Sequence, residues 1–93
     1  MADSKQERIL VVEDESHLAE GLKLNLTLEG YEVRIAADGS SALQEWKEWR
    51  PDLIVLDIML PQIDGLSVLR TIRLDDERLP ILICLPKRIP STG

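Results

Sequence analysis

The chain has 93 residues, with 11 Lys and Arg against 17 Asp and Glu, a formal net charge of −6 and 44% hydrophobic residues. This length fits one small domain, residues 1–93, and the apolar share excludes wholesale disorder. The acidic balance argues against nucleic-acid or anionic-membrane binding, which needs clustered Lys and Arg. The single cysteine, Cys84, cannot form an internal disulfide, and the sequence contains neither a signal-peptide-like run nor a membrane span. We therefore expect a cytoplasmic domain with no membrane or nucleic-acid partner.

The first predicted elements follow a polar segment, residues 1–7, which we expect to be flexible. Residues 9–12 form a continuous aliphatic run, typical of a strand buried on both faces. Residues 15–29 predict a helix, and Gly30 stands at the usual stop position. The helix carries one stripe of leucines spaced four apart: Leu18, Leu22 and Leu26.

The next elements are an edge strand and a second helix. Residues 31–36 alternate apolar and charged side chains, which favours a half-exposed edge strand. A helix is predicted to start near Asp38, a good capping residue, and to end before Pro51, because proline disfavours a helical conformation in the residue that precedes it. Its predicted apolar positions are Ala42, Leu43, Trp46 and Trp49.

The second half repeats this alternation. Residues 53–56 predict another fully buried strand, followed by a loop at residues 58–64. A third helix is predicted from Gly65 to about Leu74, with Leu66, Leu69 and Ile72 on one stripe. After a charged connector, residues 79–85 predict a fourth aliphatic strand, and residues 86–93, with two prolines, predict an irregular tail.

Strands that alternate with helices predict an α/β fold with a parallel sheet and right-handed crossovers. Ligands of such sheets bind at the carboxyl ends of the strands. Two of the predicted buried strands end in acidic residues, Glu13-Asp14 and Asp57. If these strands are neighbours, about 5 Å apart, the three side chains meet in one pocket.

A pocket of three carboxylates needs a positive charge to offset their mutual repulsion. Oxygen-only ligands favour a hard cation, and Mg²⁺ takes one or two carboxylates while it keeps several waters. Such a site suits phosphoryl transfer, in which a carboxylate can be the nucleophile. Acidic residues are also common at solvated strand ends, and for Glu13-Asp14 alone that interpretation would prevail. Asp57 at the matching end of another buried run favours the functional interpretation.

These residues carry a family resemblance that covers about residues 7–84. The segment ILVVED, residues 9–14, resembles the first strand and acidic pair of the receiver domain of bacterial two-component response regulators. The segment DIMLPQIDG, residues 57–65, resembles the loop after the third strand of these domains almost letter for letter. The resemblance implies a flavodoxin-like, doubly wound parallel sheet with strand order 2-1-3-4.

The resemblance also implies a set of functional residues. Asp57 would be the phosphoacceptor, which takes a phosphoryl group from the phosphohistidine of a sensor histidine kinase. Glu13, Asp14 and Asp57, with the backbone carbonyl of Met59, would hold Mg²⁺. Such a domain modifies itself and turns over no free substrate, so it is not an enzyme in the usual sense. Many members of the family also regulate transcription through a separate DNA-binding domain.

The chain departs from the family pattern in its last third. A Ser or Thr is expected at the end of the fourth strand, where this chain has Leu85, or Cys84 if the register slips by one. A Lys at the end of a fifth strand is also expected, and Lys87 stands on the wrong element to replace it. The fifth strand and the last two helices are missing, so we expect an incomplete receiver domain. Its apolar fourth strand would then have an open edge, through which the chain would dimerise, unless the fold is only marginally stable.

Two alternatives stay open beside the phosphoacceptor hypothesis. The first is a degenerate receiver domain that keeps the fold but serves as a non-switching interaction or dimerisation module. The second is a phosphatase of the haloacid-dehalogenase type, which also uses an Asp at a strand end. That class expects a second Asp two residues after the nucleophile, where this chain has Met59.

Overall fold

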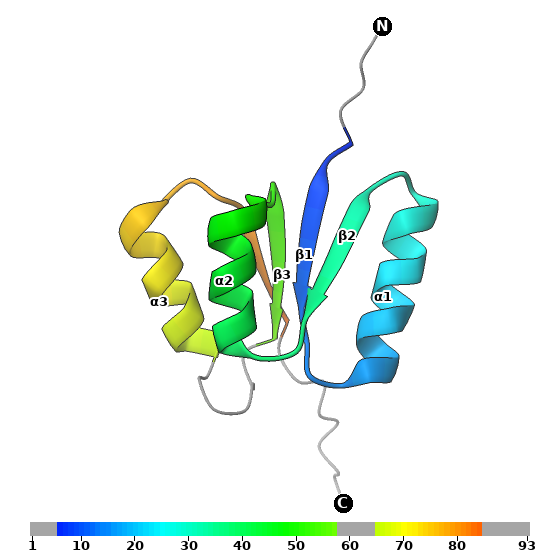
Figure 1. Cartoon of the computed structure of the whole chain (residues 1–93), viewed down its shortest axis with the longest axis horizontal. Helices are drawn as coiled ribbons and strands as arrows, with labels where there is room; N and C mark the ends of the chain where they lie inside the picture. The colour runs from blue at the N-terminus through cyan, green and yellow to red at the C-terminus, as the bar shows by residue number, and fades with distance from the viewer. Residues whose placement is uncertain (1–5, 58–64, 85–93) are drawn as a thin grey trace, which may run out of the picture.

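The computed structural model describes residues 6–57 and 65–84, which alternate strands and helices along the chain. The elements, in order, are β1 (Arg8–Val12), α1 (Ser16–Leu28), β2 (Glu32–Ala36), α2 (Gly39–Trp49), β3 (Leu53–Asp57), α3 (Gly65–Asp75) and β4 (Ile81–Cys84). The strands form one parallel sheet in the order β2-β1-β3-β4 (Figure 1). The predicted flavodoxin-like strand order is therefore confirmed. In the described part of the chain, no helix has the length and apolar character needed to cross a membrane.

Local capping explains where two of the helices begin and end. At the end of α1, Gly30 has a φ of +101°, and the N–H groups of Gly30 and Tyr31 donate to the carbonyls of Thr27 and Leu26 at 3.0 and 3.1 Å. This is a Schellman motif, which needs a residue that tolerates positive φ. At the start of α2, the Asp38 carboxylate accepts a hydrogen bond of 2.8 Å from the Ser41 N–H. The predicted stop at Gly30 and cap at Asp38 are thus confirmed.

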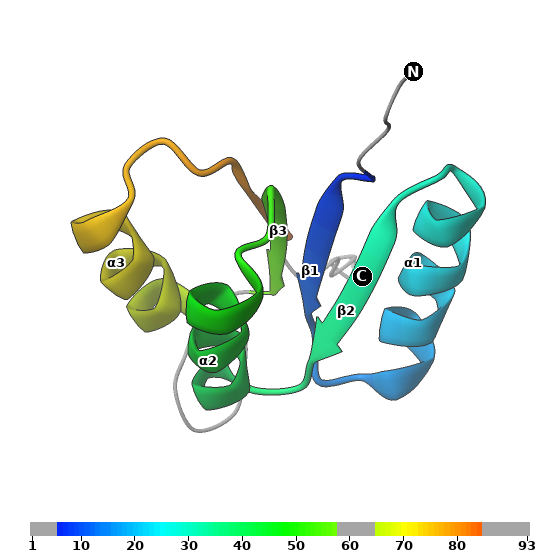
Figure 2. The ribbon, with the colours of Figure 1, turned by 45° about the horizontal axis from the view of Figure 1, so that its top comes forward.

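The larger core lies between the sheet and the pair α2 and α3, which share one face (Figures 1 and 2). Alternate residues of β1 and β3 point to this face, as the period of a strand requires. The two tryptophans of α2 are buried in it, as the sequence predicted. The buried residues of this core are Leu10, Val12, Ala36, Ala42, Trp46, Trp49, Ile54, Leu56, Val68, Ile72 and Leu79.

Among the described elements, only α1 covers the opposite face of the sheet, where it lies along β2 and β1 (Figure 2). A smaller cluster forms there from Ile9, Val11, Val33 and Val55, with Leu26 and Cys84 packed against it. Since one helix is narrower than four strands, the β3–β4 half of this face has less cover. Leu82, on this side of β4, is 57% exposed.

The structure corrects the predicted apolar stripe of α1 and one residue of the stripe of α3. In α1, Ala19 is buried, whereas Leu18 is 59% exposed, so the contact line with the sheet runs beside the predicted leucine stripe. In α3, Ile72 of the predicted stripe is fully buried and Leu69 packs against the larger core. Leu66 of this stripe is exposed, whereas Val68 is buried. Both helices have neighbouring apolar positions on more than one row, and periodicity alone does not say which of these positions meet the sheet. The tertiary packing decides this.

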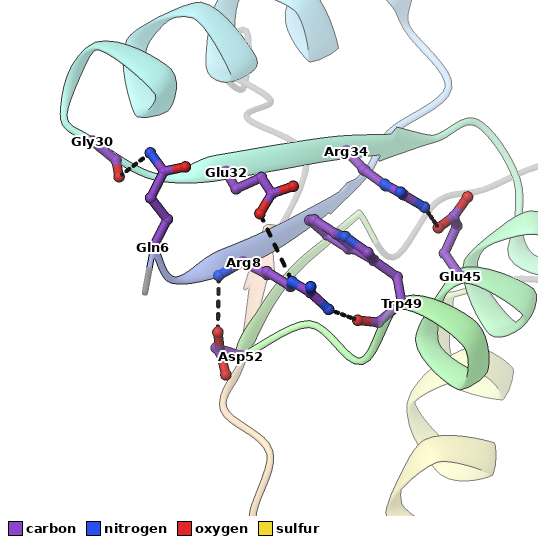
Figure 3. A network of polar contacts seen from close by, with 8 residues as sticks. All are labelled: Gln6, Arg8, Gly30, Glu32, Arg34, Glu45, Trp49 and Asp52. Atoms are coloured by element: carbon purple, nitrogen blue, oxygen red, sulfur yellow. Dashed lines mark hydrogen bonds and ion pairs between the residues drawn. The ribbon is translucent and has the colours of Figure 1, made fainter. Parts of the chain in front are cut away.

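A polar network ties together the strand ends opposite the predicted acidic pocket (Figure 3). Arg8 forms an ion pair with Glu32 at 3.8 Å and donates to the main-chain carbonyl of Trp49. The guanidinium groups of Arg8 and Arg34 lie 5.5 and 4.8 Å from the centre of the Trp49 ring. The Arg8 N–H also donates to the Asp52 carboxylate at 2.9 Å. These contacts link β1, β2 and the end of α2, so the sheet is anchored away from the acidic pocket.

Candidate functional site

The candidate site lies at the carboxyl edge of the two central strands. Because β1 and β3 pair directly, with Val12 opposite Leu56, the residues that follow them stand side by side. One carboxylate oxygen each from Glu13, Asp14 and Asp57 can be chosen so that all three lie within 4.8 Å of one another. The structure therefore brings together the three acidic side chains that the sequence analysis selected. Glu13 and Asp57 are half-buried, while Asp14 is exposed.

The local backbone holds Glu13 in this pocket. Its N–H donates to the Ala36 carbonyl at 3.0 Å, which extends the pairing of β1 with β2 by one residue. Its carboxylate accepts a hydrogen bond of 3.1 Å from the Glu15 N–H at the start of α1. The side chain is thus fixed between the end of a strand and the first turn of a helix.

The pKa of Glu13 reflects the electrostatics of the pocket. Burial raises the pKa of Glu13 above its ordinary value of 4.5, and the negative charges of Asp57 and Asp14 raise it further. The hydrogen bond from the Glu15 N–H acts in the opposite direction on this pKa but does not outweigh the other causes. A bound cation would offset this repulsion, because it favours the ionised form of all three carboxylates.

The donor set fits a hard divalent cation. It consists of carboxylate oxygens at a partly open edge of the sheet, which suits Mg²⁺ and leaves room for water ligands. Within residues 6–57 and 65–84, the three carboxylates are fewer protein ligands than a closed calcium cage uses. Met59, whose carbonyl was predicted as a further ligand, lies outside the described residues.

A fourth side chain near the pocket is Cys84, at the end of β4. In the register of β3 and β4, Cys84 is the partner of Asp57. Burial raises the pKa of the Cys84 thiol, and the nearby charges of Asp57 and Glu13 raise it further. The sequence alone predicts Leu85 at this corner, or Cys84 if the register slips by one, and Leu85 is outside the described residues. The strand register, which sequence alone does not reveal, brings Cys84 to the pocket.

Two further polar side chains do not belong to the group of three carboxylates. His17 is exposed in the first turn of α1. In the acidic connector, the Asp76 carboxylate accepts hydrogen bonds from the N–H groups of Arg78 and Leu79, at 3.0 and 3.1 Å. Asp76 therefore stabilises the turn that leads into β4.

Comparison with known proteins agrees with this fold and pocket. The family model of the response regulator receiver domain matches residues 9–88. The chain belongs to the response regulator receiver domain family. These domains are the signalling modules of two-component systems rather than classical enzymes, and the resemblance stated from the sequence is confirmed.

Individual relatives of this receiver domain are response regulators. The chain is 44% identical over 85 residues to the DNA-binding response regulator MtrA of Mycolicibacterium smegmatis. This match covers 91% of the chain and 37% of MtrA. It is 46% identical over 76 residues to the response regulator MprA of Mycobacterium avium, over 82% of the chain and 33% of MprA. The chain thus spans about a third of the length of these relatives.

Solved receiver structures also resemble this chain. The chemotaxis response regulator CheY4 of Vibrio cholerae superposes with a TM-score of 0.82 at 30% identity. The match covers 85% of this chain and 68% of CheY4.

Proposed function

We propose that this receiver domain is a phosphoacceptor whose Asp57 is phosphorylated by a sensor histidine kinase. The observation that carries the proposal is the convergence of Glu13, Asp14 and Asp57 within 4.8 Å at the carboxyl edge of the sheet. An Asp57 carboxylate oxygen attacks the phosphorus of a phosphohistidine; an O–P bond forms, the N–P bond breaks, and the imidazole leaves with the electron pair. The product is an acyl phosphate, which water later hydrolyses to restore Asp57.

In this proposal Glu13, Asp14 and Asp57 hold Mg²⁺, together with the Met59 carbonyl. The bound ion supplies positive charge that offsets the charge on the phosphoryl oxygens. The protein's own residues do the rest: Glu13 and Asp14 fix the position of the cation, and Asp57 provides the nucleophile. We also propose that the domain works in the cytoplasm. Regulation of transcription by the whole protein is a proposal that rests on likeness to relatives such as MtrA.

Incubation with acetyl phosphate and Mg²⁺, followed by intact mass measurement, tests the proposal. We expect a mass gain of one phosphoryl group that disappears in Asp57→Asn and on omission of Mg²⁺. Asp75→Asn, which removes the same charge at the exposed end of α3, is the matched control and should still be phosphorylated. A gain that persists in Asp57→Asn would reject Asp57 as the phosphoacceptor.

The competing candidate is a receiver domain that keeps the fold without switching. The partner of Asp57 at the end of β4 is Cys84, and a thiol is a weak hydrogen-bond donor to a phosphoryl group. Absence of any mass gain in a protein shown to be folded by circular dichroism would favour this candidate. We further expect self-association through the fourth strand, which is a separate proposal and does not require phosphorylation.

A further inference from the structure

The geometry of the acidic pocket depends on how β1 and β3 are aligned along their length. Glu13 follows β1, Asp57 ends β3, and the two strands pair directly in parallel. A strand rises about 3.3 Å per residue, so a shift of one strand by one residue would move its acid by that distance. The three carboxylate oxygens lie within 4.8 Å of one another, and a shift of this size would disperse them.

The apolar side chains of the two strands specify this alignment only weakly. Residues 9–12 of β1 are all aliphatic and at most 2% exposed, and residues 54–56 of β3 are aliphatic and at most 8% exposed. Register is strongly specified in a strand with one apolar and one polar face, because a shift by one residue turns polar side chains into the core. In strands buried on both faces, the same shift exchanges one aliphatic side chain for another. A directional polar contact between the strands therefore discriminates between registers more sharply.

Such a contact lies at the opposite end of the two strands, between Arg8 and Asp52. The Arg8 N–H donates to the Asp52 carboxylate at 2.9 Å, a bond that Figure 3 shows. The Asp52 N–H donates in return to the Arg8 carbonyl at 2.7 Å. A shift by one residue would break both bonds, since neither tolerates a displacement of about 3.3 Å. We call this pair of bonds the Arg8–Asp52 clasp.

The side chain of Arg8 fixes the clasp to the rest of the fold. Its guanidinium group donates to the main-chain carbonyl of Trp49, the last residue of α2, and lies 5.5 Å from the centre of the Trp49 ring. The ring belongs to the larger core and is 5% exposed. Arg8 also forms an ion pair of 3.8 Å with Glu32 of β2. The first residue of β1 is thus held to α2 and β2 as well as to Asp52.

The clasp and the pocket are separated by equal lengths of the two strands. Glu13 follows Arg8 by five residues, and Asp57 likewise follows Asp52 by five residues. Since both strands have the same rise, a clasp that levels them at one end also levels them at the pocket, about 17 Å away. We propose that Asp52 is a positioning residue for the acidic pocket. Its clasp with Arg8 sets the register of β1 and β3, and this register places Glu13 beside Asp57.

Two variants of Asp52 separate the clasp from the charge. Asp52→Ala and Asp52→Asn both remove one negative charge, but only asparagine keeps an oxygen that accepts the hydrogen bond from the Arg8 N–H. NMR titration with Mg²⁺ measures the effect, and this readout rests on the metal site of the proposed function. We expect Asp52→Ala to raise the dissociation constant at least about threefold, because that constant rises as the fraction of molecules in the competent register falls. Asp52→Asn should bind Mg²⁺ like the wild-type protein.

Asp76→Ala is the matched control for loss of a structural carboxylate. Asp76 also accepts main-chain hydrogen bonds, from Arg78 and Leu79, but these lie in the turn before β4 and not between β1 and β3. We expect this variant to keep the wild-type affinity for Mg²⁺. Equal weakening by Asp52→Ala and Asp52→Asn would assign the effect to charge, and equal weakening by Asp76→Ala would assign it to general stability. Either result would overturn the proposal.

A second readout needs no metal. Nuclear Overhauser effects between the register partners Val12 and Leu56 report the alignment of β1 and β3 directly. In Asp52→Ala they should fall to about a third or less of the wild-type intensity, and in Asp52→Asn and Asp76→Ala they should stay unchanged. Unchanged intensities in Asp52→Ala would overturn the proposal whether or not Mg²⁺ binds, because core packing would then set the register. Reduced intensities in a protein that binds no Mg²⁺ would support the role of Asp52 and reject the metal site instead.

Discussion

Glu13 is the residue that couples the acidic pocket to pH. Its pKa lies above 4.5 because it is partly buried beside Asp57 and Asp14. Between that ordinary value and the raised one, the folded state binds more protons than the unfolded state. The free energy of unfolding therefore falls as the pH rises through this window, when no metal is present.

Glu13→Gln removes this pH dependence. Because the amide carries no charge to repel Asp57 and Asp14, we expect the metal-free variant to be more stable than the wild-type protein at neutral pH. Urea unfolding followed by circular dichroism, at a series of pH values from acid to neutral, measures the effect. Glu20→Gln, an exposed change on α1, is the control and should keep the wild-type pH profile. A Glu13→Gln profile that parallels the wild type would show that Glu13 does not set the pH response.

At the scale of single elements, α1 shows where sequence patterns stop being informative. Its end was predictable, because Gly30 adopts a positive φ that other residues avoid. Its orientation was not, because Leu18, Leu24 and Leu28 are as apolar as the half-buried Leu26, yet remain exposed. The helix is apolar around much of its circumference, and only its position over β1 and β2 selects the row that is covered.

The orientation of α1 leads to a direct test. Leu26→Ala should destabilise the protein by about 1–2 kcal/mol, because the side chain is half-buried against the smaller core cluster. Leu18→Ala should change stability by no more than about 0.5 kcal/mol, as expected for a surface substitution. Chemical denaturation of both variants gives the two values. Equal losses would mean that the predicted leucine stripe, rather than the observed contact line, faces the sheet.

At the scale of the whole molecule, the charge distribution links folding to metal binding. The chain has a net charge of −6, and three of its carboxylates converge at one edge of the sheet. The folded state thus concentrates negative charge that the unfolded chain keeps apart. A divalent cation bound by this cluster would stabilise the folded state over the unfolded state.

We therefore expect Mg²⁺ to raise the midpoint of thermal unfolding. At a concentration ten times the dissociation constant, the gain is about 1.4 kcal/mol by mass action. Asp57→Asn should lose most of this gain, whereas Asp75→Asn should keep it. Sodium chloride at matched ionic strength separates specific binding from general screening. If sodium chloride gave the same stabilisation, or if Asp57→Asn kept the full gain, the proposed metal site would be rejected.

The sequence predicted the order of the strands and helices and the ends of α1 and α2, because these depend on local chemistry. It also predicted the three acidic residues of the pocket, because parallel strands end at the same edge of a sheet. The sequence could not show that Leu18 of α1 and Leu66 of α3 are exposed, or that Cys84 stands opposite Asp57. Those features depend on strand register and on the position of helices over the sheet. Both are set by contacts between residues far apart in the chain, and only the tertiary structure decides them.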